Sequence, residues 1–333
     1  MGSTDVAVKN EIKVYDLNTG YKPGPKRKNK NTFLKEFKTN KALFFMLLLP
    51  LVYVIIQFYL PMAGLIVAFK NYNYTDGLFK SPWIGLENFK FLFMSSDAWI
   101  ITRNTILYNL AFIFLGLIVS IAFAVMLNEL RNRFAAKFYQ STMLLPYILS
   151  WVVVAYFVYA LLEPKNGLIN RNLLNLGITP PDWYQEEKYW PFILTFVNLW
   201  KTAGYGSIIY LAAITGIDET YYEAALLDGC SKWKQFCYIT LPFLKPTIVI
   251  LTIMNLGNIF RSDFGLFYQV TMNSGSLFNT TNTIDTYVYR GLLGTGTIGQ
   301  SSAAGLYQSC VGFVVVLIAN WIIGKLSPED KIF

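Results

Sequence analysis

Six apolar stretches separated by polar segments limit this chain to a small set of folds. Several of them reach the roughly 20 residues that a helix needs to cross a ~30 Å hydrocarbon core. Only 14% of the 333 residues are charged, whereas a soluble domain carries about a quarter. The sequence therefore predicts an all-α polytopic membrane protein. Its six predicted transmembrane helices are residues 42–69, 105–127, 142–162, 191–215, 247–260 and 302–323.

Lysine and arginine set the predicted orientation, because cytoplasmic segments keep positive charge more readily than exported ones. With six helices, both termini lie on the same side of the membrane. If that side is the cytoplasm, 18 of the 28 Lys and Arg residues fall inside, nine fall outside, and Lys201 lies within a helix. This bias predicts cytoplasmic N- and C-termini and a cytoplasmic loop at residues 218–246.

These helices divide the chain into five predicted regions. The formal net charge of +8 is concentrated in the N-terminal region, next to a membrane helix, so anionic lipid is a simpler partner for it than nucleic acid. The regions are a basic cytoplasmic tail (1–41), the first transmembrane helix (42–69), an external loop (70–104), a transmembrane core containing the 218–246 loop (105–325) and a cytoplasmic C-terminal tail (326–333).

The chain has no histidine and only three cysteines, which argues against an enzyme or a metalloprotein. The Ser/His/Asp and Cys/His catalytic arrangements need histidine, and zinc would have to be bound by thiols and carboxylates alone. A GxGxxG string at residues 294–299 lies in a predicted external loop rather than in a βαβ unit, so we expect a flexible turn there. We predict no catalytic residue, no metal site and no cofactor bound by this chain.

The 218–246 loop has the pattern of two short helices. Thr220 and Glu223 have the spacing of a capping box, which predicts a helix that begins near residue 221. Gly229 can adopt the positive φ that ends such a helix, and Ser231 can cap a second one. We expect Pro242 and Pro246 to end this unit, which would lie along the membrane surface.

The spacing of this loop also resembles a known motif. Glu223-Ala-Ala, then Gly229, then Ile239-x-Leu241-Pro242 matches the cytoplasmic EAA loop of binding-protein-dependent ABC importer permeases. The resemblance implies that the loop docks on an ATPase subunit, with Glu223 near a basic residue of that subunit. An ordinary connecting loop, with Glu223 only as a cap, is the alternative. The implied coupling residues are Tyr222, Glu223, Ala224, Ala225, Asp228, Gly229, Ser231, Ile239, Leu241 and Pro242.

Other strings narrow the resemblance to sugar permeases of the maltose type, and to LplB-like polysaccharide permeases. They are the sequences at 258–264 (Asn-Ile-Phe-Arg-Ser-Asp-Phe) and 284–290 (Ile-Asp-Thr-Tyr-Val-Tyr-Arg), and Ala319-Asn320. The resemblance implies the type I importer permease fold with six transmembrane helices in a bacterial plasma membrane. It also implies ATP-driven uptake of a carbohydrate. Import of a non-sugar solute is one alternative, and an ion-coupled secondary transporter is another.

The same resemblance implies several partners. They are a second, homologous permease subunit, two ATPase subunits that bind ATP and magnesium, and an extracellular solute-binding protein. The external segments at 70–103 and 163–189 are long enough to form a docking surface for that binding protein.

Several polar and aromatic residues in or near the last three core helices could line a sugar pathway. Aromatic rings stack on the C–H faces of sugars and amides bind hydroxyl groups, although such residues also serve as lipid anchors or in packing. A charge at Lys201 is costly inside a transmembrane helix. We therefore expect this residue to line a pathway or gate, to pair with a carboxylate such as Asp263, or to snorkel to the membrane interface. The candidates are Trp200, Lys201, Tyr205, Asn255, Asn258, Arg261 and Asp263, with Tyr268, Asn273 and Tyr287 further along.

Overall fold

The structure is a computed structural model that describes residues 39–293 and 298–326. Within these residues it is helical, with no β-strand beyond an isolated bridge between Lys70 and Trp83. Contacts divide the chain into two compact units, of which the first ends at Met62 and the second begins at Ala63.

The first unit contains a single apolar helical segment. It consists of α2 (Lys41–Val54), one π-helical turn η1 (Ile55–Tyr59) and α3 (Leu60–Met62), and none of its residues is buried. With η2 (Ala63–Phe69) it makes a helix of 29 residues that is long and apolar enough to cross a membrane. The predicted first transmembrane helix, residues 42–69, therefore corresponds to a continuous helical segment.

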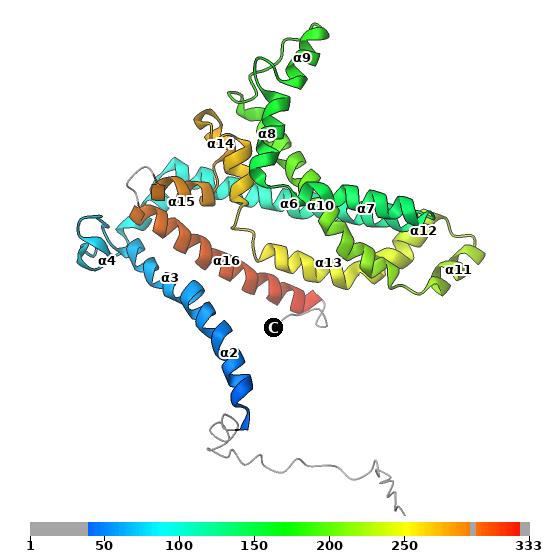
Figure 1. Ribbon diagram of the computed structural model, residues 1–333, viewed down its shortest axis with the longest axis horizontal. Helices are drawn as coiled ribbons and strands as arrows, with labels where there is room; N and C mark the ends of the chain where they lie inside the picture. Colours follow the sequence, from blue (N-terminus) through cyan, green and yellow to red (C-terminus); the bar gives the residue numbers. More distant parts are fainter. Residues whose placement is uncertain (1–38, 294–297, 327–333) are drawn as a thin grey trace, which may run out of the picture. The chain divides into compact units, whose positions relative to one another are not determined.

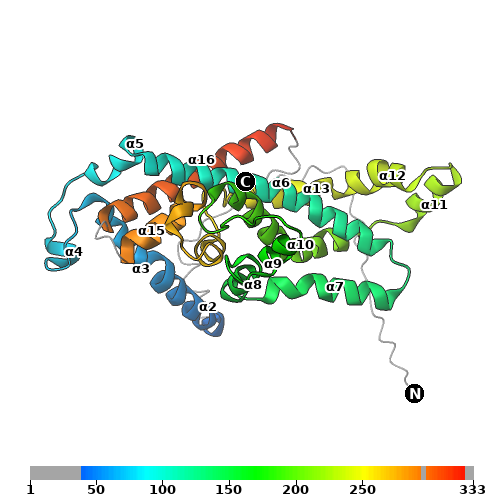
Figure 2. The ribbon, with the colours of Figure 1, turned by 90° about the horizontal axis from the view of Figure 1, so that it is seen from above.

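Three helices form the centre of the second unit. They are α6 (Ser96–Asn128), α7 (Arg133–Ile148) and α10 (Trp190–Thr215). Figure 2 shows α10 between α6 and α7, and it packs against both. Small residues and polar groups of α10 are buried in these contacts. The small residues allow the helix backbones to approach closely.

The remaining long helices surround this centre. The C-terminal half of α6 packs with α10 and α13 (Leu241–Leu256) around Ile121, Tyr210 and Leu244. The last helix, α16 (Ile298–Leu326), packs against α15 (Ile284–Leu293), α13 and η2. The arrangement of α6, α7, α10 and α13 can be followed in Figure 1.

Two bends interrupt the membrane helices. The axis turns by 97° between α7 and α8 (Trp151–Leu162). The other bend follows α13, where a turn leads to η6 (Leu266–Val270). Apolar side chains of α8, α10 and η6 pack together between these bends, including Val154, Leu194 and Phe267.

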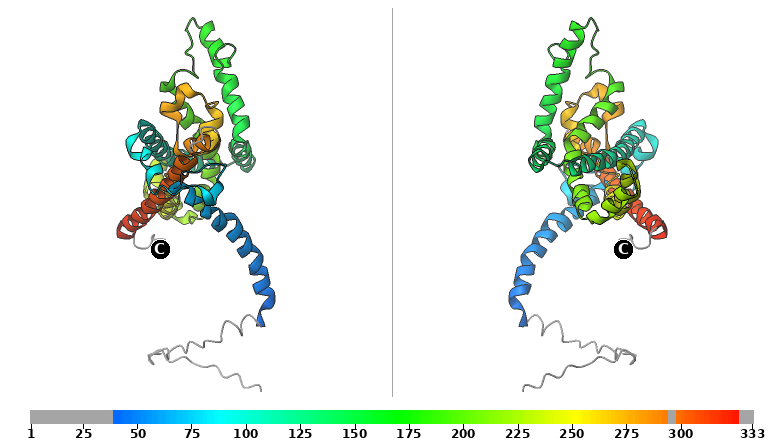
Figure 3. Two further views of the ribbon diagram at one scale, coloured as in Figure 1. Left: turned by 90° about the vertical axis from the view of Figure 1, so that its left-hand side faces the viewer. Right: turned by 90° about the vertical axis from the view of Figure 1, so that its right-hand side faces the viewer.

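Short elements make up the outer end of the unit. Figure 3 shows α8 and α9 extending from the central helices as one arm. Trp183 joins this arm to the following segment, since its indole nitrogen donates to the Asn170 side chain at 2.6 Å. The short elements are α4 (Gly77–Lys80), η3 (Glu87–Phe89), α5 (Phe91–Met94), α9 (Leu168–Asn175), η4 (Glu187–Tyr189), η7 (Gly275–Leu277) and α14 (Phe278–Thr281).

The helices differ from the predicted spans mainly in two places. The span at 142–162 is two helices with a sharp bend, and the span at 247–260 belongs to a helix that begins at Lys232. Four helices of the described residues are apolar and long enough to cross a membrane, or five if the bent pair counts as one. Helix α10 matches residues 191–215 but is not among them, because it carries Lys201, Asn198 and other polar groups that neighbouring helices bury.

The count of six helices, the orientation and the predicted region boundaries stay predictions. The tails at 1–38 and 327–333 and the predicted turn at 294–297 lie outside the described residues. Gly299 of that glycine pattern is part of α16, where a Cβ atom would clash with Asn88.

Candidate functional site

The candidate coupling loop begins with α11 (Glu219–Leu227). Its N-cap is Asp218, whose carboxylate accepts a hydrogen bond of 3.0 Å from the backbone N–H of Thr220. This corrects the predicted capping box: Asp218 already occupies the capping position, so Thr220 lies inside the helix. The hydrogen bonds from Thr220, mainly from its backbone N–H, hold the pKa of Asp218 below its usual range.

The end of α11 is a complete Schellman motif around Gly229. Its backbone N–H bonds the carbonyl oxygen of Leu226 at 3.1 Å, and that of Cys230 bonds Ala225 at 2.9 Å. Gly229 has a φ of 72°, which L-residues with a side chain rarely adopt. The prediction that Gly229 ends this helix is confirmed.

The second helix, α12 (Lys232–Gln235), starts where it was predicted. The hydroxyl of its N-cap Ser231 accepts a long bond of 3.5 Å from the N–H of Lys234. The predicted end is wrong, because the helix continues through η5 (Phe236–Thr240) into α13. Pro242 lies in the first turn of α13. The wider π-helical turn η5 precedes it and shifts the pairing of the backbone hydrogen bonds, so the helix continues through Pro246.

Several large apolar side chains of this loop are exposed, and Trp233 also borders a cavity. Leu227 is 89% exposed, Tyr238 79% and Trp233 72%. Glu223 is also exposed, and no hydrogen bond or ion pair reaches its side chain from the residues that the structure describes. Exposed apolar groups around an unpaired carboxylate are typical of a surface that binds another protein.

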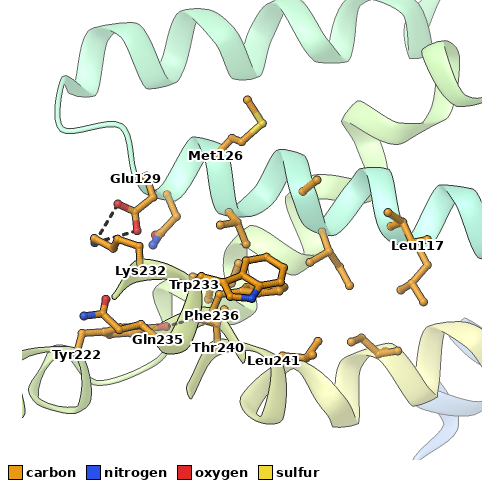
Figure 4. A pocket seen from close by; sticks show the side chains of 17 residues that line it. Leu117, Met126, Glu129, Tyr222, Lys232, Trp233, Gln235, Phe236, Thr240 and Leu241 are labelled. Carbon is orange, nitrogen blue, oxygen red and sulfur yellow. Dashed lines mark hydrogen bonds and ion pairs between the residues drawn. The ribbon is translucent and has the colours of Figure 1, made fainter. Parts of the chain in front are cut away.

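A cavity of about 700 Å³ lies behind this surface, between α6 and the helix that begins at α12 (Figure 4). Its walls are mainly apolar and include Met126, Trp233 and Phe236. At one side Lys232 forms an ion pair of 3.0 Å with Glu129. Of the predicted coupling residues, Tyr222 and Leu241 line this cavity, and the Tyr222 hydroxyl contacts the Thr240 hydroxyl at 2.9 Å.

The other predicted coupling residues lie along the same loop. Ala224 and Ala225 are in α11, Asp228 is its C-cap residue, and Ile239 is in the η5 turn. The structure thus gathers these residues on two connected helices, and their role in coupling stays a prediction.

A second cavity, of about 350 Å³, lies between α6, α10 and α13. Its polar lining is uncharged and consists of amide and hydroxyl groups. Three of the predicted pathway residues line it: Tyr205, Asn255 and Asn258. The sequence prediction missed Asn109, Asn198 and Thr202, which also line it, although an asparagine inside an apolar span was a visible signal.

The other predicted pathway residues do not line this cavity. Trp200 is 44% exposed on α10, and Arg261 contributes a backbone carbonyl that accepts a 3.0 Å bond from Asn109. Lys201 is buried, and its ammonium group donates to backbone carbonyl oxygens at the end of α7. Asp263 accepts a 2.8 Å bond from the Trp151 indole and forms no ion pair with Lys201.

Among the described residues, no group of three or more His, Cys, Asp or Glu side chains could hold a metal ion. The expectation that this chain binds no cofactor stays a prediction.

Comparisons with known proteins agree with this fold. Residues 113–328 match the family described as "Binding-protein-dependent transport system inner membrane component". The chain is 34% identical over 312 residues to the polygalacturonan/rhamnogalacturonan transport system permease protein YteP of Bacillus subtilis, covering 91% of this chain and 94% of that protein. It is 30% identical over 298 residues to Protein LplB of the same species, covering 90% and 93%.

Solved structures also resemble it. A chain of a bacterial ABC transporter involved in the import of the acidic polysaccharide alginate superposes with a TM-score of 0.81 at 32% identity, covering 89% of this chain and 99% of that one. A chain of the alginate transporter in complex with a periplasmic protein that holds an alginate pentasaccharide gives 0.79 at 32% identity, covering 88% and 97%. These matches exclude the ion-coupled secondary transporter considered from the sequence. The chain belongs to the family of binding-protein-dependent transport system inner membrane components.

Proposed function

We propose that this chain is the permease subunit of an ATP-driven importer that takes up a carbohydrate delivered by an extracellular binding protein. Family membership makes it a transport component of the plasma membrane rather than an enzyme. The proposed cargo is an oligosaccharide or a fragment of a polysaccharide.

Two observations support a carbohydrate as the cargo. The names of the similar proteins refer to polygalacturonan, rhamnogalacturonan and alginate. The cavity between α6, α10 and α13 is lined by side chains that suit sugar hydroxyls, among them Asn198, Thr202 and Asn255. Tyr205 adds an aromatic ring to this wall and stacks on Tyr147 with ring centroids 4.3 Å apart.

The coupling proposal is carried by one observation: α11 and α12, joined at Gly229, present Glu223 and several apolar side chains to solvent. We assign this surface to contact with an ATPase subunit that binds ATP and magnesium. Two permease subunits, each with such a surface, would fit a pair of ATPases. Closure of the ATPase pair on ATP would draw the two coupling loops together and shift the helices from an inward-facing to an outward-facing arrangement.

Replacement of Gly229 by aspartate tests this coupling. An L-residue at φ 72° is strained, so Gly229→Asp should distort the turn and reduce copurification of the ATPase with the permease. Gly177→Asp is the matched control, since Gly177 has a φ of 75° and open surroundings but lies after α9, far along the chain from the loop. Normal ATPase association and uptake by the Gly229→Asp complex would contradict the proposal.

The cargo can be tested separately. The complete transporter, reconstituted with its binding protein in liposomes, should take up labelled oligosaccharides in an ATP-dependent way. Titration of the binding protein with neutral and acidic oligosaccharides then identifies the class that it delivers. ATP-dependent uptake of a non-sugar solute alone would leave the coupling proposal intact and disprove the carbohydrate cargo.

A further inference from the structure

Lys201 on α10 is buried beside the bend between α7 and α8, with 7% of its surface exposed. Its ammonium group donates hydrogen bonds to the backbone carbonyl oxygens of Pro146 at 3.1 Å and Tyr147 at 2.9 Å, and to that of Leu149. An ammonium group has three donors, so all of them are used. The same group lies 5.1 Å from the centre of the Trp151 ring.

These carbonyl groups lack their usual helical partners because the helix stops there. The last four carbonyl groups of a helix have no partner within it. If α7 and α8 formed one straight helix, Pro146 and Tyr147 would accept bonds from the backbone N–H groups of Ser150 and Trp151. In the bent chain Leu149 and Ser150 have extended backbone angles, and the Lys201 ammonium group donates to both carbonyl oxygens instead. The carbonyl oxygen of Pro146 also accepts the backbone N–H of Leu149, at 3.3 Å.

The charge of Lys201 is also matched across the bend. The Trp151 indole faces the ammonium group, and its N–H donates to the carboxylate of Asp263 at 2.8 Å. Asp263 in turn accepts the backbone N–H groups of Gly265 at 3.0 Å and Leu266 at 3.3 Å, at the start of the helix after the second bend. A cation on the face of an indole and a carboxylate at its edge both stabilise this arrangement.

We propose that Lys201 is a positioning residue that holds the α7–α8 segment bent. It competes with the backbone N–H groups of Ser150 and Trp151 for the carbonyl oxygens of Pro146 and Tyr147. The segment then has two arrangements that satisfy its backbone: a bent one that uses Lys201 and a straight one that uses its own helical hydrogen bonds. The consequence for transport rests on the proposed importer function, whereas the preference for the bent arrangement does not.

A distance measurement across the bend tests this inference. Spin labels at Lys137→Cys on α7 and Tyr156→Cys on α8 lie on exposed positions. With a rise of 1.5 Å per residue, the separation of these backbone positions is about 28 Å in a straight helix and about 21 Å in a right-angled one. The full chain is measured with its partner subunits in lipid nanodiscs, without substrate or nucleotide. The native thiols are replaced by serine in all labelled chains: Cys230, Cys237 and Cys310.

Lys201→Met should add a population at the longer distance, while Lys201→Arg, which keeps a cation with several donors, should retain the shorter one. Lys188→Met is the matched control, because Lys188 is an exposed cation in the short η4 turn, where it pairs with Glu186 and lies over the Tyr189 ring. A Lys201→Met chain with the same distance distribution as the unsubstituted labelled chain would overturn the inference.

If Lys201→Met does not assemble, Lys201→Gln decides the question, since its amide offers two donors without a charge. It should show a smaller longer-distance population, and an unchanged distribution would overturn the inference. Uptake measured in liposomes should fall about tenfold for Lys201→Met, as expected for the loss of charged hydrogen bonds, and recover in part with arginine. The distance measurement needs no substrate. Its result would therefore stand even if the proposed function were wrong.

Discussion

Gly204 of α10 lies directly on Met143 of α7, so that a Cβ atom at Gly204 would overlap the carbonyl oxygen of Met143. This contact lies one turn after Lys201, on the side of α10 that meets the end of α7. The lysine and the glycine thus fix one helix against the other, one by hydrogen bonds and the other by close approach.

Gly204→Ala should therefore destabilise the protein despite the better helix propensity of alanine. Because the obstacle is backbone, the helices must separate, and overpacking of this kind costs about 1–3 kcal/mol. Gly206→Ala should cost less, since its Cβ atom would meet the Ser120 hydroxyl at 2.5 Å and this side chain can rotate. Thermal unfolding of the purified complex measures both effects.

Gly305→Ala supplies the control for these substitutions. Gly305 lies in α16, and apart from the adjacent helix backbone no atom of the described residues comes within 4 Å of its Cβ position, so alanine should stabilise the helix by up to ~1 kcal/mol. An equal change in melting temperature for the substitutions at 204 and 305 would contradict the role given to the close approach.

Much of this fold is readable from the sequence, because the length of an apolar stretch is a local signal. The helix end at Gly229 follows from the same kind of local rule, since glycine avoids the cost of a positive φ. The bend after Ile148 is different, because the chain there has no glycine and the only proline nearby, Pro146, lies inside α7. The bend depends on a lysine that is 52 or more residues away, and single-sequence patterns do not show such a contact.

The polar cavity was predicted only in part for the same reason. Asn255 and Asn258 are close in sequence, but Asn109 and Asn198 reach the cavity from other helices. Which polar residues of different helices meet depends on helix rotation and packing. The sequence indicates that such residues are costly in a membrane, and packing decides which of them share a wall.

The N-cap of α11 should make the start of this helix sensitive to acid. Because hydrogen bonds from Thr220 lower the pKa of Asp218, they favour its ionised form. The capping contribution is complete above the ordinary aspartate pKa of about 4 and is lost as the pH falls through the lowered pKa of the folded loop. Hydrogen exchange of the first α11 amides, measured between neutral and acidic pH, should show this loss.

Asp218→Ala should abolish that pH dependence and speed exchange at neutral pH, whereas Asp218→Ser, which keeps a capping oxygen, should slow it again. Glu223→Ala, which removes the side chain that a capping box would use, distinguishes this cap from the capping box expected from sequence. It should leave exchange at the start of α11 unchanged, and a large increase would restore Glu223 to a capping role.

The ion pair between Glu129 and Lys232 should contribute little to stability. Both side chains are at least half exposed, at 50% and 72%, and exposed pairs contribute about 0–1 kcal/mol. Lys232→Met should therefore shift the melting temperature of the complex only slightly at low salt and not at all at high salt. A large decrease in melting temperature that does not depend on salt would show instead that the ion pair holds the wall of the adjacent cavity together.

The polar cavity between α6, α10 and α13 should contribute to transport rate rather than to substrate capture. Asn255→Ala removes an amide that is exposed within the cavity wall, and the loss of one hydrogen bond of about 1 kcal/mol corresponds to about a fivefold slower uptake. The affinity of the proposed binding protein for its substrate should not change, because the substitution lies in a different polypeptide. Trp200→Phe is the comparison, since Trp200 was expected on the pathway but lies outside this cavity, and uptake should stay normal. If Trp200→Phe slows uptake and Asn255→Ala does not, the substrate follows another face of α10.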